Sequence, residues 1–77
     1  MDLQKFIENF AGQFDETDKG EFKADTKFRS LPEWNSMIAL SIIAMIDDEY
    51  NIVIKGDDIR NSQTIEEIFN KVKGYKG

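Results

Sequence analysis

The fold of this chain is decided by the stretch WNSMIALSIIAMIDDEY, which occupies residues 34–50. Apolar residues fill most of positions 37–46, and no charged residue interrupts them before Asp47. A run of this length is far shorter than the ~20 apolar residues that span a bilayer. It predicts a buried core helix over residues 36–50, whose apolar positions cover most of its circumference and pack on several neighbours at once.

Ser36 lies where an irregular polar stretch gives way to this helix. A helix start carries unsatisfied N–H groups and partial positive charge, so an exposed hydroxyl there favours a covalently attached phosphate. We interpret Ser36 as a modification site and not as a catalytic nucleophile. Two alternatives remain open. Ser36 is only an N-cap, worth ~1 kcal/mol of stability, or the helix begins at Ser30, whose spacing to Glu33 resembles a capping box and would bury Ser36 inside the helix.

An amphipathic helix is expected before this stretch, over residues 2–14. Its apolar residues recur at spacings of three and four, as a helix with one buried face requires. They are Leu3, Phe6, Ile7, Phe10 and Phe14. Residues 15–33 lose this periodicity and predict a long loop, which apolar residues pin to the core at Phe22, Phe28 and Leu31.

The remainder of the chain predicts one short and one longer helix. Residues 51–54 favour an extended segment and residues 57–60 one helical turn. Thr64 followed by Glu67 forms a capping-box pattern that begins a last helix. We expect Gly74 to end it and residues 75–77 to form a frayed end. The sequence thus predicts a small all-α four-helix bundle, with three longer helices and one short helix, as a single domain over residues 1–77.

Composition excludes several classes of function. The 77 residues contain no cysteine and no histidine, which removes disulfides, thiolate chemistry, imidazole catalysis and nearly every transition-metal site. With 15 acidic and 10 basic residues, the net charge is −5. Nucleic acid and anionic membranes are therefore poor partners, whereas proteins with basic patches are suitable ones.

Metal binding and export are not expected either. Residues 15–20 place a glycine at the sixth position of an apparent calcium loop. The fifth and twelfth positions are Lys19 and Thr26, where such a loop needs an oxygen ligand and a bidentate glutamate. The N-terminal residues do not form a signal peptide, so we expect a cytoplasmic protein. We also expect it to be a monomer.

The order of the expected elements resembles that of the acyl carrier protein family over essentially the whole chain. That family opens its second helix with Asp-Ser-Leu or Asp-Ser-Met, and the matching residues here are Asn35, Ser36 and Met37. Several separate downstream matches make the resemblance more specific than one tripeptide. The matching residues are Asp47, Asp48, Glu49, Tyr50, Ile52, Ile54, Asp57, Asp58, Ile59, Thr64, Ile65, Glu66 and Glu67.

The resemblance implies that a phosphopantetheinyl transferase moves 4′-phosphopantetheine from coenzyme A onto Ser36. Acyl groups would travel as thioesters on this arm and pass to synthases or acyl-transferring enzymes of a fatty-acid, specialised acyl or polyketide pathway. Aminoacyl and D-alanyl carriers share the fold and the serine, so the cargo stays open. The chain would be a carrier and not an enzyme. The rival from another class is an unmodified acidic helical adaptor that docks its second helix on a partner.

Departures from the family pattern concern the docking surface. Asn35 stands where these carriers have Asp, a residue that in the family helps the transferase. Ile38 and Ser41 occupy positions that are commonly acidic in fatty-acid carriers, and Ile38 is equally consistent with a core position. The expected docking residues, facing basic patches on partners, are Asn35, Met37, Ile38, Ser41, Asp47 and Asp48.

Trp34 directly precedes the attachment region, where many fatty-acid carriers have a small residue. An aromatic ring with a polar N–H often anchors an exposed interface. The competing role, which we favour, is packing over the long loop to hold Ser36 in place.

Overall fold

The computed structural model describes residues 2–76, which form four α-helices and two short 3-10 turns. The helices are α1 (Leu3–Ala11), α2 (Ser36–Tyr50), α3 (Gly56–Arg60) and α4 (Ile65–Lys76), and the turns are η1 (Lys19–Glu21) and η2 (Phe28–Ser30). Within residues 2–76 there is no strand, and the one isolated β-bridge pairs Lys27 with Thr64. The expected small all-α class is confirmed.

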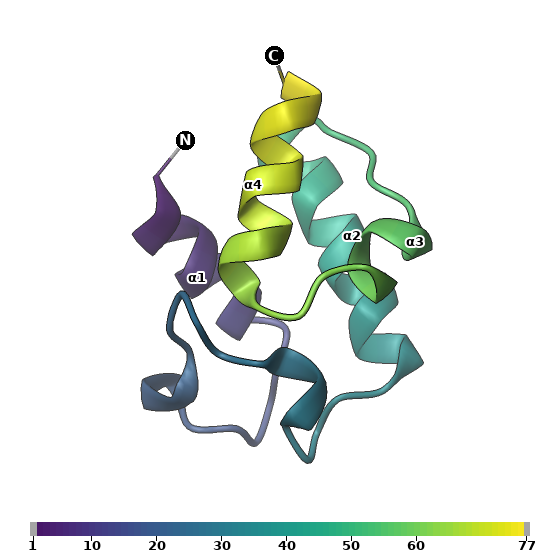
Figure 1. Cartoon of the computed structure of the whole chain (residues 1–77). Coiled ribbons are helices and arrows are strands. Elements are labelled where there is room, and N and C mark those ends of the chain that lie inside the picture. The colour runs from purple at the N-terminus through teal and green to yellow at the C-terminus, as the bar shows by residue number, and fades with distance from the viewer. Residues whose placement is uncertain (1, 77) are drawn as a thin grey trace.

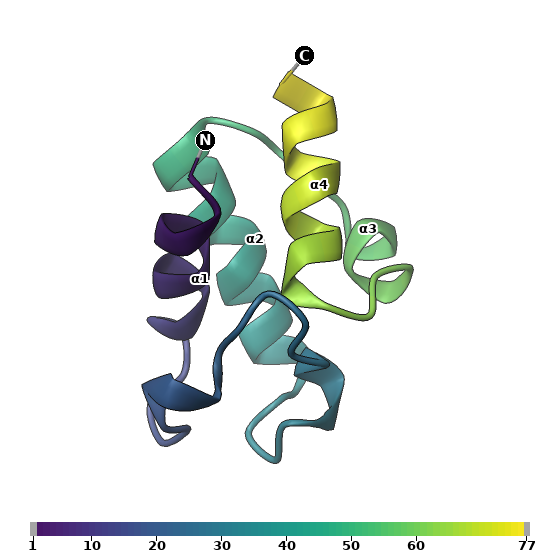
Figure 2. The same cartoon turned by 60° about the vertical axis from the view of Figure 1, so that its left-hand side comes forward.

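The two longest helices lie alongside α1, and the short α3 lies beside both α2 and α4 (Figures 1 and 2). The long connection between α1 and α2 crosses one end of this arrangement (Figure 1). One hydrophobic core joins all of these parts, and it includes all six phenylalanines of the chain. The largest apolar side chains that are fully buried are Phe6, Phe10, Phe28, Ile42, Ile46, Ile65, Ile68 and Val72.

The first helix is shorter than the expected residues 2–14. Asp2 caps it, because its side chain accepts a hydrogen bond from the Gln4 N–H at 3.0 Å. Beyond Ala11 the chain passes through Gly12 into a tighter turn, in which the Phe14 N–H donates to the Ala11 carbonyl at 3.0 Å. The periodicity continues to Phe14 because this residue is buried in the core although it lies outside the helix.

The second helix has the expected bounds, Ser36–Tyr50, and the alternative start at Ser30 is wrong. Ser30 belongs to η2, and the chain is extended at Leu31 before α2 begins. Asn51 ends α2 in the left-handed conformation, with φ 58° and ψ 39°. Of the helices formed by residues 2–76, none is both long and apolar enough to cross a membrane.

The expectation of a buried core helix packed on several neighbours holds for one face of α2 and fails for the other. Ile42, Met45 and Ile46 are buried, whereas Met37 is 75% exposed and Leu40 65% exposed. The physical reason is the small number of neighbours: α1 and α3 contact α2, and in Figure 1 its first turns extend beyond them towards the long connection.

The last helix does not end at Gly74. It continues to Lys76, so Tyr75 is helical and not frayed, and Gly77 lies outside the described residues. The Tyr75 hydroxyl donates a hydrogen bond to Asp58 Oδ2 at 2.8 Å, which ties the end of α4 to α3. At the start of α4, Thr64 Oγ1 accepts from the Glu67 N–H at 3.2 Å, which is the capping contact that the sequence predicts. The Glu67 carboxylate reaches back to the Gln63 N–H instead of completing the box on Thr64.

Candidate functional site

Ser36 is the first residue of α2, and its neighbour Asn35 is the N-cap. Asn35 Oδ1 accepts a hydrogen bond from the Ile38 N–H at 2.9 Å, and the Asn35 carbonyl accepts one from the Ala39 N–H at 3.1 Å. The alternative in which Ser36 itself caps the helix is therefore wrong. Because Asn35 does the capping, the exposed Ser36 hydroxyl is not needed to hold the helix together.

The surroundings of Ser36 favour an attached anion. The first turn of α2 contains no acidic residue. Helix geometry leaves the first N–H groups without intrahelical acceptors, and the helix dipole adds partial positive charge at the same end. A negatively charged group bonded to the Ser36 oxygen would meet favourable electrostatics on its own helix.

A pocket of about 560 Å³ adjoins Ser36 between α2 and α3. Its wall is mainly apolar, and two arginines, Arg29 of η2 and Arg60 of α3, also line it. The volume of the pocket and its lining residues are in the range of small-molecule sites, which usually have an apolar wall with a few polar groups. The lining residues are Arg29, Trp34, Asn35, Ser36, Ala39, Leu40, Ile43, Gly56, Ile59 and Arg60.

Trp34 packs on the long loop and also lines the pocket. Its ring centroid lies 4.8 Å from that of Phe28 and 6.3 Å from that of Phe14. The packing role that we favoured is confirmed, while a role at an interface stays a prediction. Because Trp34 is the chain's one tryptophan, its fluorescence reports directly on this pocket.

The six expected docking residues do not share one environment. Met37, Asp47 and Asp48 are exposed, whereas Ile38 and Ser41 are half-buried, and Ile38 packs against the core. Asn35 is exposed but serves as the cap.

Leu40 is exposed on α2 and was missed by the sequence reasoning. It lies one helical turn beyond Met37, so the two form an exposed apolar ridge next to the pocket. The spacing of 37 and 40 hints at this shared face, but the apolar residues on every side of α2 conceal which face is covered.

Glu33 was also missed, and it organises the loop that leads to Ser36. Its carboxylate accepts hydrogen bonds from the N–H groups of Asp15 at 2.7 Å, Glu16 at 3.1 Å and Thr17 at 3.0 Å, and from the Thr17 hydroxyl at 2.8 Å. The Asp15 N–H contributes most to holding the pKa of Glu33 below its ordinary value of 4.5, against the opposing effect of desolvation. No sequence motif announces this role, because the donors lie 16 to 18 residues away.

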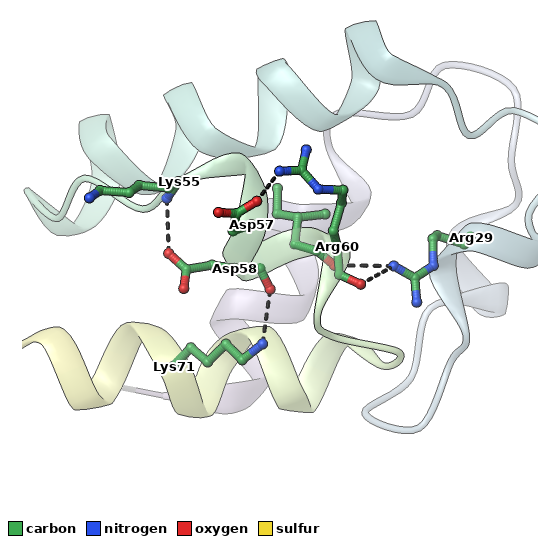
Figure 3. A network of polar contacts seen from close by, with 7 residues as sticks. Arg29, Lys55, Asp57, Asp58, Arg60 and Lys71 are labelled. Atoms are coloured by element: carbon green, nitrogen blue, oxygen red, sulfur yellow. Dashed lines mark hydrogen bonds and ion pairs between the residues drawn. The ribbon is translucent and has the colours of Figure 1, made fainter.

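A polar network fixes α3, which forms one wall of the pocket (Figure 3). Asp58 Oδ2 accepts from the Lys55 N–H at 2.9 Å, and the Asp58 carbonyl accepts from Lys71 Nζ at 3.0 Å. The Lys55 N–H, and after it the Tyr75 hydroxyl and nearby lysines, lower the pKa of Asp58 despite partial burial. The same contact with Asp58 raises the pKa of Tyr75 above its usual 10.0.

Arg29 fixes the other end of α3. Its Nη1 donates to the Arg60 carbonyl at 2.7 Å and to the Ile59 carbonyl at 3.3 Å, as Figure 3 shows. These carbonyls belong to the last turn of α3, where a cation is favourable for the helix dipole. Arg29 therefore couples the long loop to the wall of the pocket.

Comparison of the chain with protein-family models, curated protein sequences and solved structures gave no match. A functional assignment therefore depends on the site itself and on the sequence pattern around Ser36. The site combines an exposed hydroxyl, a capped helix start and an adjoining pocket with an apolar wall. It contains no histidine or cysteine that could activate the hydroxyl for catalysis within this chain.

Proposed function

We propose that this chain is an acyl carrier protein whose Ser36 carries 4′-phosphopantetheine. The observation that carries the proposal is the exposed Ser36 hydroxyl at the first position of α2, released from capping by Asn35. The order of the helices and the long connection before α2 agree with the carrier type of bundle. Neither the attachment nor the carrier type follows from the fold class alone.

In the proposed modification, a separate transferase removes the proton from Ser36 Oγ. The oxygen forms a bond to the β-phosphorus of coenzyme A, and the pyrophosphate bond breaks. The adenosine 3′,5′-bisphosphate leaves, and the chain keeps the arm with its terminal thiol. This chain contributes the nucleophilic oxygen and the favourable charge of a helix start, while the transferase supplies the base.

The loaded thiol would then carry acyl groups as thioesters to enzymes in the cytoplasm. We propose that these partners contact the exposed ridge of Met37 and Leu40, next to Ser36. Asp47 and Asp48 lie exposed at the far end of α2 and suit a basic patch on the partner. Fatty-acyl, polyketide, aminoacyl and D-alanyl cargo are all compatible with this arrangement.

The test is the intact mass of the chain before and after incubation with coenzyme A and a broad-specificity phosphopantetheinyl transferase. We expect a gain of one phosphopantetheine group, which Ser36→Ala abolishes. Ser41→Ala is the matched control, since Ser41 is a half-buried serine of the same helix. A gain that survives Ser36→Ala, or no gain with transferases from the native host, would remove the proposal.

A second candidate is a docking adaptor that never receives the arm. The exposed apolar ridge of Met37 and Leu40 favours it, because large apolar side chains next to each other on a surface mark interaction sites. An adaptor would act normally with Ser36→Ala and lose partner binding with Leu40→Glu. A carrier would lose function with Ser36→Ala even though its fold is unchanged.

A further inference from the structure

The pocket beside Ser36 has a charge opposite to that of the whole chain. The net charge of the chain is −5, with 15 acidic residues. The residues that line the pocket nevertheless include two arginines and no carboxylate. Fixed charges of one sign on an apolar wall attract a ligand of the other sign. The pocket therefore favours an anion.

Arg60 is the arginine whose guanidinium can turn to such an anion. Its side chain points from α3 towards α2 in Figure 3, and a Cβ added at Gly56 would lie 3.4 Å from its Nη1. Among the described residues 2–76 it forms one ion pair, with Asp57 three residues earlier, and both side chains are more than 70% exposed. Exposed pairs of this kind contribute little to stability, so the guanidinium can exchange Asp57 for a stronger acceptor.

Arg29 supports this arrangement from the long loop. Its Nη1 is used by the carbonyls of Ile59 and Arg60, which holds the backbone that carries the Arg60 side chain. Arg29 also lines the pocket, so its positive charge lies beside any ligand bound there. Arg29 therefore contributes position and charge, while Arg60 has the donors that can turn to a ligand.

We infer that Arg60, supported by Arg29, holds the phosphodiester that joins the arm to Ser36. This rests on the proposed function, because the phosphate is the group bonded to Ser36 Oγ. Ser36 and Arg60 line the same pocket, so a phosphate on that oxygen starts at the pocket and next to the helix start of α2. Guanidinium and phosphate form paired, charge-assisted hydrogen bonds. Arg60 is thus a positioning residue that orders the base of the arm.

The first part of the test uses the unmodified chain and free 4′-phosphopantetheine, with pantetheine, which lacks the phosphate, as the matched ligand. Binding is followed by Trp34 fluorescence and by the NMR signal of the Arg60 Nε–H. We expect binding of phosphopantetheine to exceed that of pantetheine and to weaken about tenfold in Arg60→Gln, the loss of a charge-assisted hydrogen bond. Arg60→Lys should restore part of it, and Lys5→Gln, an exposed cation on α1, should change nothing.

Equal binding of the two ligands, or equal affinities of Arg60→Gln and Lys5→Gln, would overturn the inference. Inorganic phosphate is a third probe. If it binds as tightly as phosphopantetheine and produces the same shifts, the pocket is a general anion site and the assignment to the arm is overturned. Unchanged amide signals of α3 in Arg60→Gln would show that the variant keeps its fold.

The second part uses the chain after incubation with the transferase. We expect the ³¹P line of the attached phosphodiester to be broader in the natural chain than in Arg60→Gln, because an anchored phosphate moves with the protein. A mass gain with identical ³¹P lines would leave the carrier function standing and overturn the role of Arg60. Phosphate-dependent binding without any mass gain would overturn the proposed function and the covalent attachment, and leave an anion site for a free ligand.

Discussion

Asn35 and Ser36 differ in what their side chains do at the start of α2. Asn35 accepts the hydrogen bond from the Ile38 N–H, and Ser36 keeps its hydroxyl exposed. Removing the cap therefore affects stability, whereas removing the Ser36 hydroxyl leaves the cap in place. Under the proposed function it removes the attachment site, so stability and modification can be separated by mutation.

Asn35→Ala is expected to lower the free energy of unfolding by about 1 kcal/mol, because the Ile38 N–H loses its acceptor. Asn35→Asp keeps an acceptor and adds a negative charge at the helix start, so it should stabilise by a few tenths to about 1 kcal/mol. Urea denaturation measures both changes. Under the proposed function, Asn35→Asp also raises the rate of phosphopantetheine transfer, and an unchanged rate would contradict a role for this position in transferase recognition.

Glu33 and Asp58 are expected to make the chain sensitive to acid. Both carboxylates have pKa values below their ordinary values because N–H groups donate to them. Their contribution to stability is therefore present above their unfolded pKa values, near 4.5 for Glu and 3.8 for Asp, and is lost as the pH falls through the lower folded values.

The thermal midpoint measured between neutral pH and about pH 2 checks this expectation. It should fall below about pH 4.5, and Glu33→Gln should flatten part of that fall. Glu8→Gln, a change of an exposed carboxylate on α1, is the control. If the two variants have the same acid profile, the hydrogen bonds of Glu33 do not depend on its charge.

Among the elements, α2 has one buried face and one exposed face, although both faces carry apolar side chains. Ile42 is fully buried, whereas Leu40, two residues earlier, is 65% exposed. Successive helical residues are about 100° apart, so positions 40 and 42 point to different sides. The exposed side is available to a partner and the buried side holds α2 in the bundle.

Ile42→Ala is expected to cost about 2–5 kcal/mol of stability, since it leaves a cavity in the core. Leu40→Ala removes a side chain that water already reaches, and it should change stability by less than about 0.5 kcal/mol. Denaturation curves of the two variants give the comparison. Equal costs would mean that Leu40 is covered in solution.

A substitution at the end of α4 is expected to raise the stability of the chain instead of lowering it. Gly74 lies inside a helix that continues to Lys76, and, apart from the backbone of that helix and the two neighbouring residues, an added Cβ would meet no described atom within 4 Å. Gly74→Ala should therefore stabilise the chain by about 0.5–1 kcal/mol, the difference between glycine and alanine in a helix interior. Chemical denaturation measures the gain. A loss would indicate that Gly74 ends the helix in the left-handed conformation, as its sequence position suggests.

For the molecule as a whole, the long connection between α1 and α2 is part of the core. Phe28 is fully buried, and its ring lies 5.8 Å from that of Phe10 and 4.8 Å from that of Trp34. It thus joins the first helix to the segment that precedes Ser36. A chain of 77 residues has few other large side chains to replace this contact.

Phe28→Ala is expected to cost about 3–5 kcal/mol. The whole chain, at roughly 0.05–0.15 kcal/mol per residue, has about 4–12 kcal/mol of stability, so this change removes a large part of it. We expect the shift of Trp34 fluorescence to longer wavelength, which reports exposure of the ring on unfolding, to occur at a much lower temperature or urea concentration than in the natural chain. Phe28→Leu, which keeps most of the apolar volume, should unfold cooperatively at a lower temperature. If Phe28→Ala unfolds cooperatively and is as stable as the natural chain, the connection is not part of the core.

Most of the secondary structure was predictable because it depends on neighbouring residues. The periodicity of Phe6 and Phe10 indicates α1, and the bounds of α2 and the capping contact of Thr64 were read correctly from local patterns. The errors lie at helix ends. Phe14 continues the apolar pattern for reasons of core packing, and the Tyr75–Asp58 contact holds α4 beyond Gly74.

The local sequence was enough to predict that Ser36 lies at the start of α2, because capping residues and the onset of apolar periodicity determine where a helix begins. The pocket beside Ser36 was not predictable in this way. It depends on Arg29 reaching the Arg60 carbonyl, a contact between residues 31 positions apart. Such contacts form only when segments that are distant in the sequence pack together. The same packing decides which face of α2 is buried and which stays exposed to water.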